Sequence, residues 1–234
     1  MNKQTTFQDL GLIDFKEAWD YQEELFNGVL KIKLLNDKLA ANKKKSTPNY
    51  LLFCEHPHVF TLGKSGSESN LLINNFQLLE KKASFYKINR GGDITYHGPG
   101  QLVAYPILDL DNFKLSIRKY IFSIEEAVIL TLKKYEISAS RLEGATGVWL
   151  DPEIPDKARK ICAIGVRASR WVTMHGLAFN INTDLNYFNF IHPCGMPDKA
   201  VTSLEKELGT KQDLNVVKNA LKQNLARITG MQIE

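Results

Sequence analysis

The sequence contains only three cysteines and no long apolar run, and both features narrow the class of protein to which it can belong. Its three cysteines, Cys54, Cys162 and Cys194, are an odd number at unrelated spacings. A disulfide framework is therefore not expected, and a reducing compartment fits better. The first ten residues lack the apolar core of a signal peptide, and no segment approaches the length of a membrane span. We expect a cytoplasmic protein with no membrane partner.

An excess of charge of one sign is also missing. The chain has 30 Lys and Arg residues against 26 Asp and Glu, which gives a net charge of +4. A strong nucleic-acid binder normally clusters its basic residues, whereas the one run here, Lys43–Lys45, lies in a polar connector. No nucleic-acid partner is expected. The mild positive charge would still raise the rate of association with an acidic partner.

The apolar content is ordinary, at 44% of 234 residues, so a sizeable core can form. Apolar residues at helical spacing predict helices over about Phe15–Leu39, Leu115–Tyr135 and Leu214–Ile228, the last of which stops at Gly230. No internal repeat or linker is evident, so residues 1–234 are expected to form a single α+β domain. Short apolar segments predict strands at Tyr50–Cys54, Phe85–Asn89, Leu102–Leu108, Gly147–Leu150, Lys160–Arg167 and Gly176–Asn182.

The segment Arg90–Gln101 is the most informative part of the chain. It holds four glycines and a proline in twelve residues, a composition that argues against both a packed helix and an ordinary strand. A loop of this kind can bring its N–H groups against a ligand, and it carries Arg90 and His97. Because an apolar strand follows at once, the loop is a candidate binding site on a rigid element.

Two nucleotide-binding motifs are incomplete. Gly63–Ser65 suggests a phosphate loop, but that motif needs a glycine five residues earlier, where His58 stands. The Arg90–Gln101 loop has no G-x-G-x-x-G that opens a helix. An ordinary turn is the better interpretation of Gly63–Ser65.

A metal site is also not favoured. Cys54, His56 and His58, with His192 and Cys194, have no recognised zinc spacing. Prolines 57 and 193 make both segments stiff turns. His56 and His58 are interpreted as turn residues or as the lining of a pocket.

Cys194 lies between Pro193 and Gly195, in a predicted turn. A turn leaves the sulfur accessible, but a free thiol with a pKa of about 8.5 is mostly protonated at pH 7. It would need a cationic or basic neighbour to react, and a buried loop cysteine is the alternative from this segment alone.

Lys160 begins an otherwise apolar strand. Most such lysines reach solvent, but one that points into a pocket would become a usable base. Strand alternation predicts that Cys162 shares the face of Lys160, which makes it a rival nucleophile unless burial in the strand prevents reaction.

Taken together, several blocks resemble the lipoyl(octanoyl) transferase family. They occur in the family's order between Glu55 and Leu204, and their number makes the signal far more specific than any one motif. The resemblance implies a catalytic domain similar to that of biotin ligases and lipoate-protein ligases, with a mixed β-sheet flanked by helices. The matching blocks are Arg90–Gly92 with Thr95–His97, Gly100–Gln101 and Tyr105; Lys160–Ile161 with Gly165; His175–Ala178 with Asn180; and Pro193–Gly195.

The resemblance implies transfer of an octanoyl group from octanoyl-acyl carrier protein to a lysine of a lipoyl domain, the first step of protein lipoylation. By the same resemblance Cys194 is the nucleophile, which forms an acyl-cysteine thioester, and Lys160 is its acid/base partner. No cofactor or metal is expected. The substrate-binding residues would be Arg90, Gly91, Gly92, Asp93, Ile94, Thr95, Tyr96, His97, Ala163, Ile164, Gly165, His175, Gly176, Leu177 and Ala178.

The implied acceptors are the lipoyl domains of 2-oxoacid dehydrogenases and the H protein of glycine cleavage. Three alternatives stay open at this point: an ATP-dependent lipoate-protein ligase, an amidotransferase between lipoyl domains, and a non-catalytic acyl-binding module. Whether His97 or His175 orients the Cys–Lys dyad or the arriving amine also stays open.

Overall fold

The main sheet of the computed structural model is mixed and has nine strands among the described residues, which are 1–154, 156–192 and 200–234. These strands are β1 (Gln4–Leu12), β2 (Tyr50–Glu55), β6 (Gln101–Ile107), β7 (Ser140–Leu142), β8 (Ala145–Leu150), β9 (Arg159–Ser169), β10 (Val172–Asn180), β11 (Ala200–Val201) and β12 (Gln232–Ile233). Their order is β12-β1-β2-β6-β10-β9-β8-β7, and β11 pairs with β9 outside this path. The pairs β1–β12, β1–β2 and β9–β11 are parallel, and the other pairs are antiparallel.

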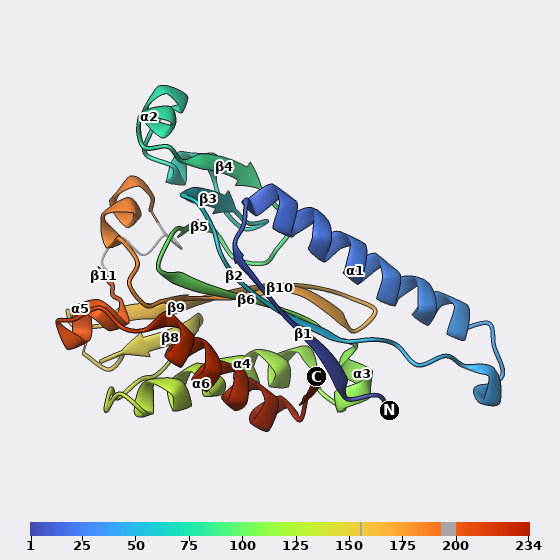
Figure 1. The fold of residues 1–234 in the computed structure, drawn as a ribbon. Coiled ribbons are helices and arrows are strands. Elements are labelled where there is room, and N and C mark those ends of the chain that lie inside the picture. Colours follow the sequence, from blue (N-terminus) through green and yellow to red (C-terminus); the bar gives the residue numbers. More distant parts are fainter. Residues whose placement is uncertain (155, 193–199) are drawn as a thin grey trace.

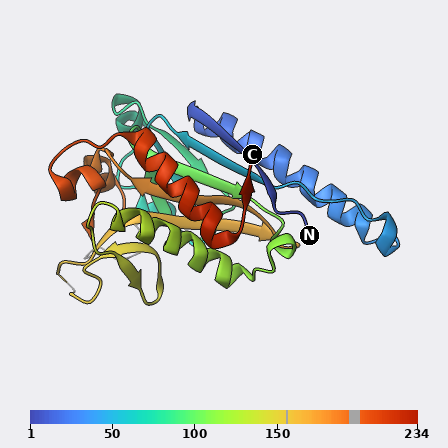
Figure 2. The same cartoon turned by 60° about the horizontal axis from the view of Figure 1, so that its bottom comes forward.

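Helices cover both faces of this sheet. Helix α1 (Phe15–Asn36) lies along one face, and α4 (Ile117–Lys133) and α6 (Leu214–Thr229) lie side by side on the other (Figures 1 and 2). The alternation of β2 explains the two layers, since successive side chains of a strand point to opposite faces. Leu51 and Phe53 pack in the cluster that contains α4 and α6, whereas Leu52 and Cys54 pack against Phe26 of α1. The mixed sheet flanked by helices is thus confirmed.

A small second sheet lies across one end of the main sheet, with the order β4-β3-β5 (Figure 1). Its strands are β3 (Val59–Leu62), β4 (Ser84–Lys87) and β5 (Ile94–His97). Helix α2 (Asn75–Glu80) and the 3-10 helix η3 (Leu185–Phe190) adjoin it, and η3 contacts β5. The remaining short elements are η1 (Ala41–Lys43), η2 (Glu68–Asn70), α3 (Leu110–Phe113) and α5 (Leu204–Leu208).

The three long helices are confirmed to within a few residues. Helix α1 starts at the predicted Phe15, where the Asp14 side chain accepts from the first N–H groups, and it ends three residues before Leu39. Gly230 ends α6 in the left-handed conformation, with φ +81°, as predicted for a glycine stop. The six predicted strands are also present, each with at least one end shifted by one to four residues.

The prediction of a loop throughout Arg90–Gln101 is wrong for residues 94–97. These residues form β5, which pairs antiparallel with β3, with Tyr96 opposite Phe60. The glycines lie only on either side of this stretch, and Ile94, Thr95 and Tyr96 are residue types that favour strands. The strands β1 and β3 were not predicted either, although β3 is entirely buried.

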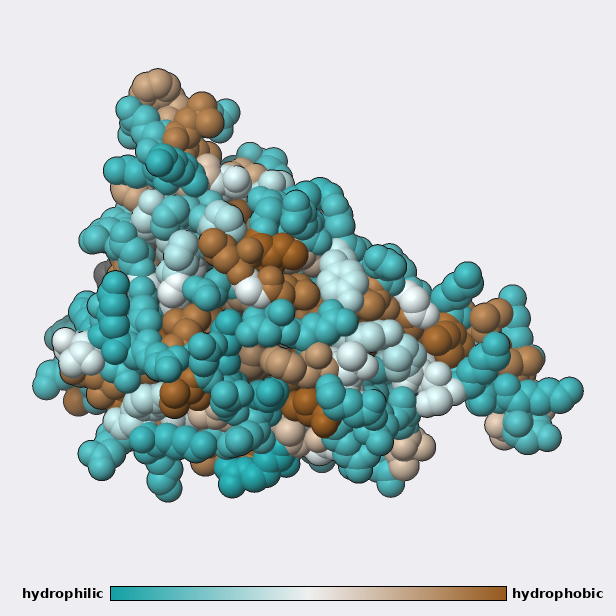
Figure 3. All heavy atoms as spheres, viewed as in Figure 1, coloured by the Kyte–Doolittle hydropathy of each residue, from teal (hydrophilic) through white to brown (hydrophobic). Residues whose placement is uncertain are grey.

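The face drawn in Figure 3 is mostly hydrophilic, with scattered apolar groups. One apolar group lies over α2, where the side chains of Phe76 and Leu79 are exposed. Within the described ranges, no helix is both long enough and apolar enough to cross a membrane.

The layer between α1 and the sheet gives a stability prediction. Phe26 is 0% exposed there, and we expect Phe26→Ala to lower the free energy of unfolding by about 3–5 kcal/mol through lost contacts and the cavity left behind. Urea unfolding measures the change. Phe76→Ala is the matched control, because that ring is 68% exposed and its loss should cost no more than about 0.5 kcal/mol. Equal losses in the two variants would contradict the assignment of this layer to the core.

Candidate active site

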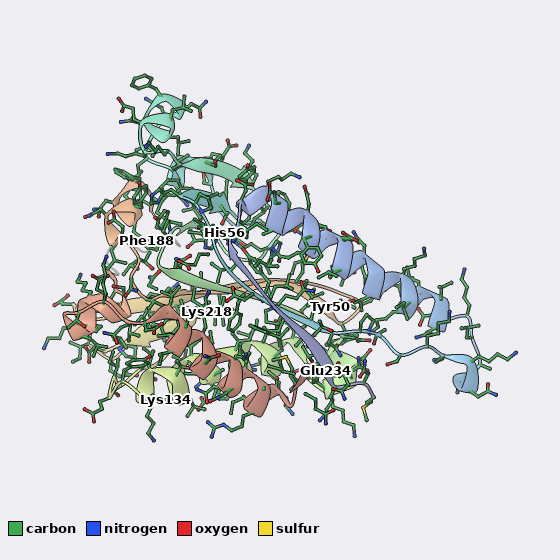
Figure 4. All side chains as sticks on the ribbon, viewed as in Figure 1. Tyr50, His56, Lys134, Phe188, Lys218 and Glu234 are labelled. Carbon is green, nitrogen blue, oxygen red and sulfur yellow. The ribbon has the colours of Figure 1, made fainter. Side chains whose placement is uncertain are left out.

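A cavity of about 250 Å³ lies where the small sheet meets the main sheet. Its walls come from β6, β9 and β10, from the segment before and within β5, and from the first turn of α1. Figure 4 labels His56 and Phe188 near this junction. Fourteen of the predicted site residues line the cavity: Arg90, Gly92, Asp93, Ile94, Thr95, His97, Lys160, Ala163, Ile164, Gly165, His175, Gly176, Leu177 and Ala178.

Two predicted binding residues do not line the cavity. The Gly91 N–H donates to the carbonyl of Val166 at 2.9 Å, so this residue joins the loop to the main sheet. The ring of Tyr96 is fully buried in the small-sheet cluster, where it stacks on Tyr187 with centroids 4.8 Å apart. Its hydroxyl is 2.7 Å from Nδ1 of His58. Both residues therefore hold the loop and the small sheet in place and do not form the cavity wall.

Cys194 lies outside the described residues. On one side of it in the chain, the His192 N–H donates to the carbonyl of Asn70 at 2.8 Å. On the other side, Ala200 and Val201 line the cavity, and Val201 pairs with Lys160 in the β11–β9 ladder.

The missing side chains of Gly63 and Gly165 let the loop at residues 90–93, called here the glycine loop, lie directly on its neighbours. A Cβ on Gly165 would lie 2.9 Å from the carbonyl oxygen of Gly91, and one on Gly63 only 2.3 Å from that of Gly92. Real Cβ atoms do not approach backbone oxygens this closely, so a side chain at either position would push the loop away. The roof of the cavity depends on these two glycines.

Arg90 places a buried positive charge at the cavity wall. Arg90 is 8% exposed. One nitrogen of its guanidinium donates to the carbonyl and the hydroxyl of Thr61 at 2.6 and 2.9 Å. Another donates to the carbonyl of Gly91 at 3.0 Å. These bonds fix the direction of the guanidinium, and its charge acts on the two nearby histidines.

His97 is held in one tautomer by a chain of amides. The Gln101 Nε2 donates to the Tyr96 carbonyl at 3.1 Å and to Asn180 Oδ1 at 2.9 Å, so its Oε1 must face His97 Nδ1 at 2.8 Å. The Nδ1 therefore carries the proton and Nε2 keeps its lone pair, 3.4 Å from the Thr61 hydroxyl. Burial lowers the pKa of His97 to about 3, and electrostatic repulsion by the neighbouring His56 is the second largest cause. His97 is neutral at pH 7.

His175 is a strained residue in the cavity wall. Its φ of +58° is unusual for a non-glycine residue within a strand. Its N–H donates to Gln22 of α1 at 3.1 Å, and its Nε2 lies 3.3 Å from Asn89 Oδ1. Burial, followed by the charge of Arg90, lowers the pKa of His175 to about 3. Strain of this kind occurs often at functional sites, and here it accompanies a neutral imidazole in the cavity wall.

His56 and His58 belong to two different hydrogen-bond networks. Both lie in the connection between β2 and β3, and neither lines the cavity, so the interpretation as turn residues holds. His56 is buried, with Nδ1 2.8 Å from the Ile13 carbonyl and Nε2 2.7 Å from the hydroxyl of Tyr105, which does line the cavity. Burial lowers the pKa of His56 to about 4.

Lys160 and Cys162 do not share a face, contrary to the prediction from alternation. The register shifts between β8 and β9, since Val148 pairs with Cys162 and its neighbour Trp149 pairs with Lys160. This bulge adds one residue to β9 and reverses the alternation. Lys160 lines the cavity beside Trp149, whereas Cys162 is fully buried in the main core, where burial raises the pKa of its thiol. The rival nucleophile is thereby disfavoured.

Several cavity residues were missed in the sequence. Gln101, Tyr105 and Asn180 belong to the blocks that carry the family resemblance, and that was the one signal that could have identified them. Phe15, Ile88, Val103, Trp149 and Phe188 look like ordinary core residues, because nothing local reveals which apolar side chains face a cavity.

Comparisons with known proteins agree with this geometry. Residues 14–226 match the family described as "Lipoyl protein ligase A/B catalytic domain". The chain is 62% identical over 212 residues to an octanoyltransferase of Flavobacterium psychrophilum, covering 91% of this chain and 90% of that one. It is 55% identical over 233 residues to an octanoyltransferase of Cytophaga hutchinsonii, covering 100% and 96%.

Two solved structures share the fold at low identity. A bipartite lipoate protein ligase from Thermoplasma acidophilum, in a study that includes its E2 lipoyl domain, has a TM-score of 0.68 at 13% identity, covering 100% of this chain and 86% of that one. A lipoate-protein ligase A bound with ATP has a TM-score of 0.67 at 14% identity, covering 100% and 88%. With a family match over most of the chain and curated relatives above 50% identity, this chain belongs to the lipoyl protein ligase A/B catalytic domain family, together with the octanoyltransferases.

Proposed function

We propose that the protein is an acyltransferase that moves an octanoyl group from octanoyl-acyl carrier protein to a lysine of a lipoyl domain. The observation that carries this proposal is an apolar cavity of about 250 Å³ with Lys160 in its wall, in a chain that is 55% identical from end to end to an octanoyltransferase. Ile88, Val103 and Leu177 give the wall the apolar character that suits an alkyl chain.

The proposal assigns the whole chain, residues 1–234, to one catalytic domain that acts in the cytoplasm without a cofactor. The donor is octanoyl-acyl carrier protein, and the acceptors are lipoyl domains of 2-oxoacid dehydrogenases and the glycine cleavage H protein. The Thermoplasma study, which includes a ligase and its E2 lipoyl domain, supports an acceptor of this class.

In the first half-reaction the Cys194 thiolate attacks the thioester carbonyl of the donor. The carbonyl carbon then bonds to Sγ, and the bond to the carrier sulfur breaks. The Lys160 ammonium gives a proton to the departing carrier thiolate, which leaves as a thiol. One thioester replaces another, so this step is close to thermoneutral.

In the second half-reaction the amine of the acceptor lysine attacks the acyl-Cys194 carbonyl. Lys160, now neutral, takes a proton from the attacking nitrogen, and the Cys194 thiolate leaves. The dyad is restored as thiolate and ammonium, and an amide has replaced a thioester. Because the amide is much more stable, this half is effectively irreversible.

Neutral histidines suit this chemistry. The pKa values of about 3 for His97 and His175 keep both imidazoles uncharged at pH 7, so neither competes with Lys160 as a cation in the wall. With Nδ1 bonded to Gln101, His97 can offer the lone pair of Nε2 to a donor such as an amine N–H.

The ATP-dependent ligase remains the main rival, since the fold is shared with lipoate-protein ligases. It would activate free octanoate as an adenylate and would need Lys160 but no nucleophilic cysteine. Product from ATP and free octanoate without acyl carrier protein would favour the ligase. Transfer from an octanoylated lipoyl domain as the sole donor would favour the amidotransferase.

Replacing the proposed nucleophile gives the first test. We expect Cys194→Ser to reduce octanoyl transfer at least about a thousandfold while the unfolding midpoint stays unchanged, because a hydroxyl cannot replace a thiolate at neutral pH. Intact-mass spectrometry after mixing with octanoyl-acyl carrier protein should show an octanoyl adduct on wild type that maps to Cys194. Wild-type activity in the variant would reject the mechanism, and no adduct on any residue would indicate a binding module.

Comparing Lys160→Ala with Cys162→Ala gives the second test. We expect Lys160→Ala to reduce both half-reactions about a hundredfold or more, in line with the usual contribution of general acid–base catalysis. Cys162→Ala should leave kcat within about twofold, because that thiol is fully buried in the core. Rapid-quench measurement of acyl-enzyme formation and decay separates the two halves. The reverse ranking would point to Cys162 as the reactive thiol.

A further inference from the structure

Trp149 lies beside the lysine of the cavity wall and was not among the predicted site residues. The Lys160 Nζ is 4.6 Å from the centroid of the Trp149 ring, within the range of a cation–π contact. Both residues line the cavity, and they face each other across the β8–β9 ladder. The bulge at this point of β9 produces the pairing, so the contact is a consequence of the irregular register.

The indole is held in place independently of Lys160. Trp149 is 2% exposed, and its Nε1–H donates to the carbonyl of Ala145 at 3.0 Å. Within the same strand, the Gly147 N–H donates to the buried carboxylate of Glu125 at 3.0 Å, and Glu125 pairs with Arg141 at 2.9 Å. The ring therefore forms a fixed surface beside a flexible side chain.

The missing side chain of Gly147 lets β8 approach β9 closely beside Lys160. A Cβ at this position would lie 2.6 Å from the Cys162 carbonyl and 3.5 Å from Cδ and Cε of Lys160, and its φ of +130° is one that glycine adopts most readily. The close approach of the two strands places Cδ and Cε of Lys160 beside β8, next to the ring. Register, burial and a missing side chain all place the ammonium at the indole.

The contact discriminates between the two protonation states of the lysine. The face of an aromatic ring attracts an ammonium through its quadrupole, but it attracts a neutral amine only weakly. In the proposed mechanism Lys160 alternates between these two forms once in each half-reaction. The ring therefore stabilises one of the two states that the reaction requires.

We propose that Trp149 is a positioning residue that holds Lys160 while it is an ammonium and releases it when it becomes neutral. In the held state Lys160 gives its proton to the departing carrier thiolate. In the released state its lone pair takes a proton from the attacking lysine nitrogen, and the ammonium then returns to the ring. This inference rests on the proposed function of Lys160.

Kinetics of two substitutions test the proposal. Trp149→Leu removes the ring face that holds Lys160 in position and should slow acyl-enzyme formation about tenfold, a rise of about 1.4 kcal/mol in the activation free energy. Trp149→Phe keeps a weaker face and should lose about two- to threefold. The KM for octanoyl-acyl carrier protein should stay unchanged in both. Trp171→Leu is the control, because that indole is 49% exposed in the β9–β10 turn and should leave all rates unchanged.

A spectroscopic test separates positioning from packing. The protein is labelled with 5-fluorotryptophan, and the ¹⁹F resonance of Trp149 is assigned as the one lost in Trp149→Phe. Lys160→Met keeps the stem and removes the charge, so it should shift this resonance, while Lys160→Arg should shift it less. Neither variant should move the resonances of Trp19 and Trp171 as far.

The outcomes distinguish this inference from the function on which it rests. The role of Trp149 would be overturned by wild-type acylation rates in Trp149→Leu. An unchanged ¹⁹F chemical shift of Trp149 in Lys160→Met would overturn it as well. If Lys160→Ala has lost its activity in the same experiments, the proposed function stands without it. If Lys160→Ala is fully active, the proposed function itself has failed.

Discussion

The close approach of the glycine loop to the main sheet is the constraint on which the rest of the site depends. The bond from the Gly91 N–H to the Val166 carbonyl, together with the missing side chain of Gly165, places the loop directly over β9. That approach gives the cavity its roof and brings Arg90 to its wall. A side chain at position 165 would raise the loop and open the cavity to water, and an apolar cavity exposed to water loses its affinity for an alkyl chain.

The basic side chains of the cavity wall differ in their surroundings. The two histidines of the cavity wall, His97 and His175, are kept neutral mainly by desolvation, and His97 is held in one tautomer by Gln101. The guanidinium of Arg90 is oriented by hydrogen bonds to Thr61 and Gly91, and its charge acts on both histidines. Lys160 lies beside an aromatic ring at another part of the wall.

The fold alone does not decide the reaction. Lipoate-protein ligases share it at 13–14% identity, and one of those structures contains ATP. A fold of this kind can serve either the activation of a free acid or transfer from a thioester. The assignment here rests on close octanoyltransferase relatives and on the residues of the cavity, with Cys194 as the proposed nucleophile.

The sequence by itself determined the elements whose signals are local. Helical spacing located α1, α4 and α6, since an amphipathic stripe is a property of one segment, and Gly230 marked the end of α6. The glycine-rich composition of Arg90–Gln101 located the loop beside the cavity. The family resemblance identified Lys160 and thirteen further residues that line this cavity.

Only the tertiary structure decided which side chains meet. The bulge that separates Lys160 from Cys162 depends on the pairing of β9 with β8, and residues 94–97 became a strand because β3 lies beside them. Trp149 became part of the site because its partner in that ladder is Lys160. Register and pairing are set by contacts between distant segments, so no local pattern in the sequence contains them.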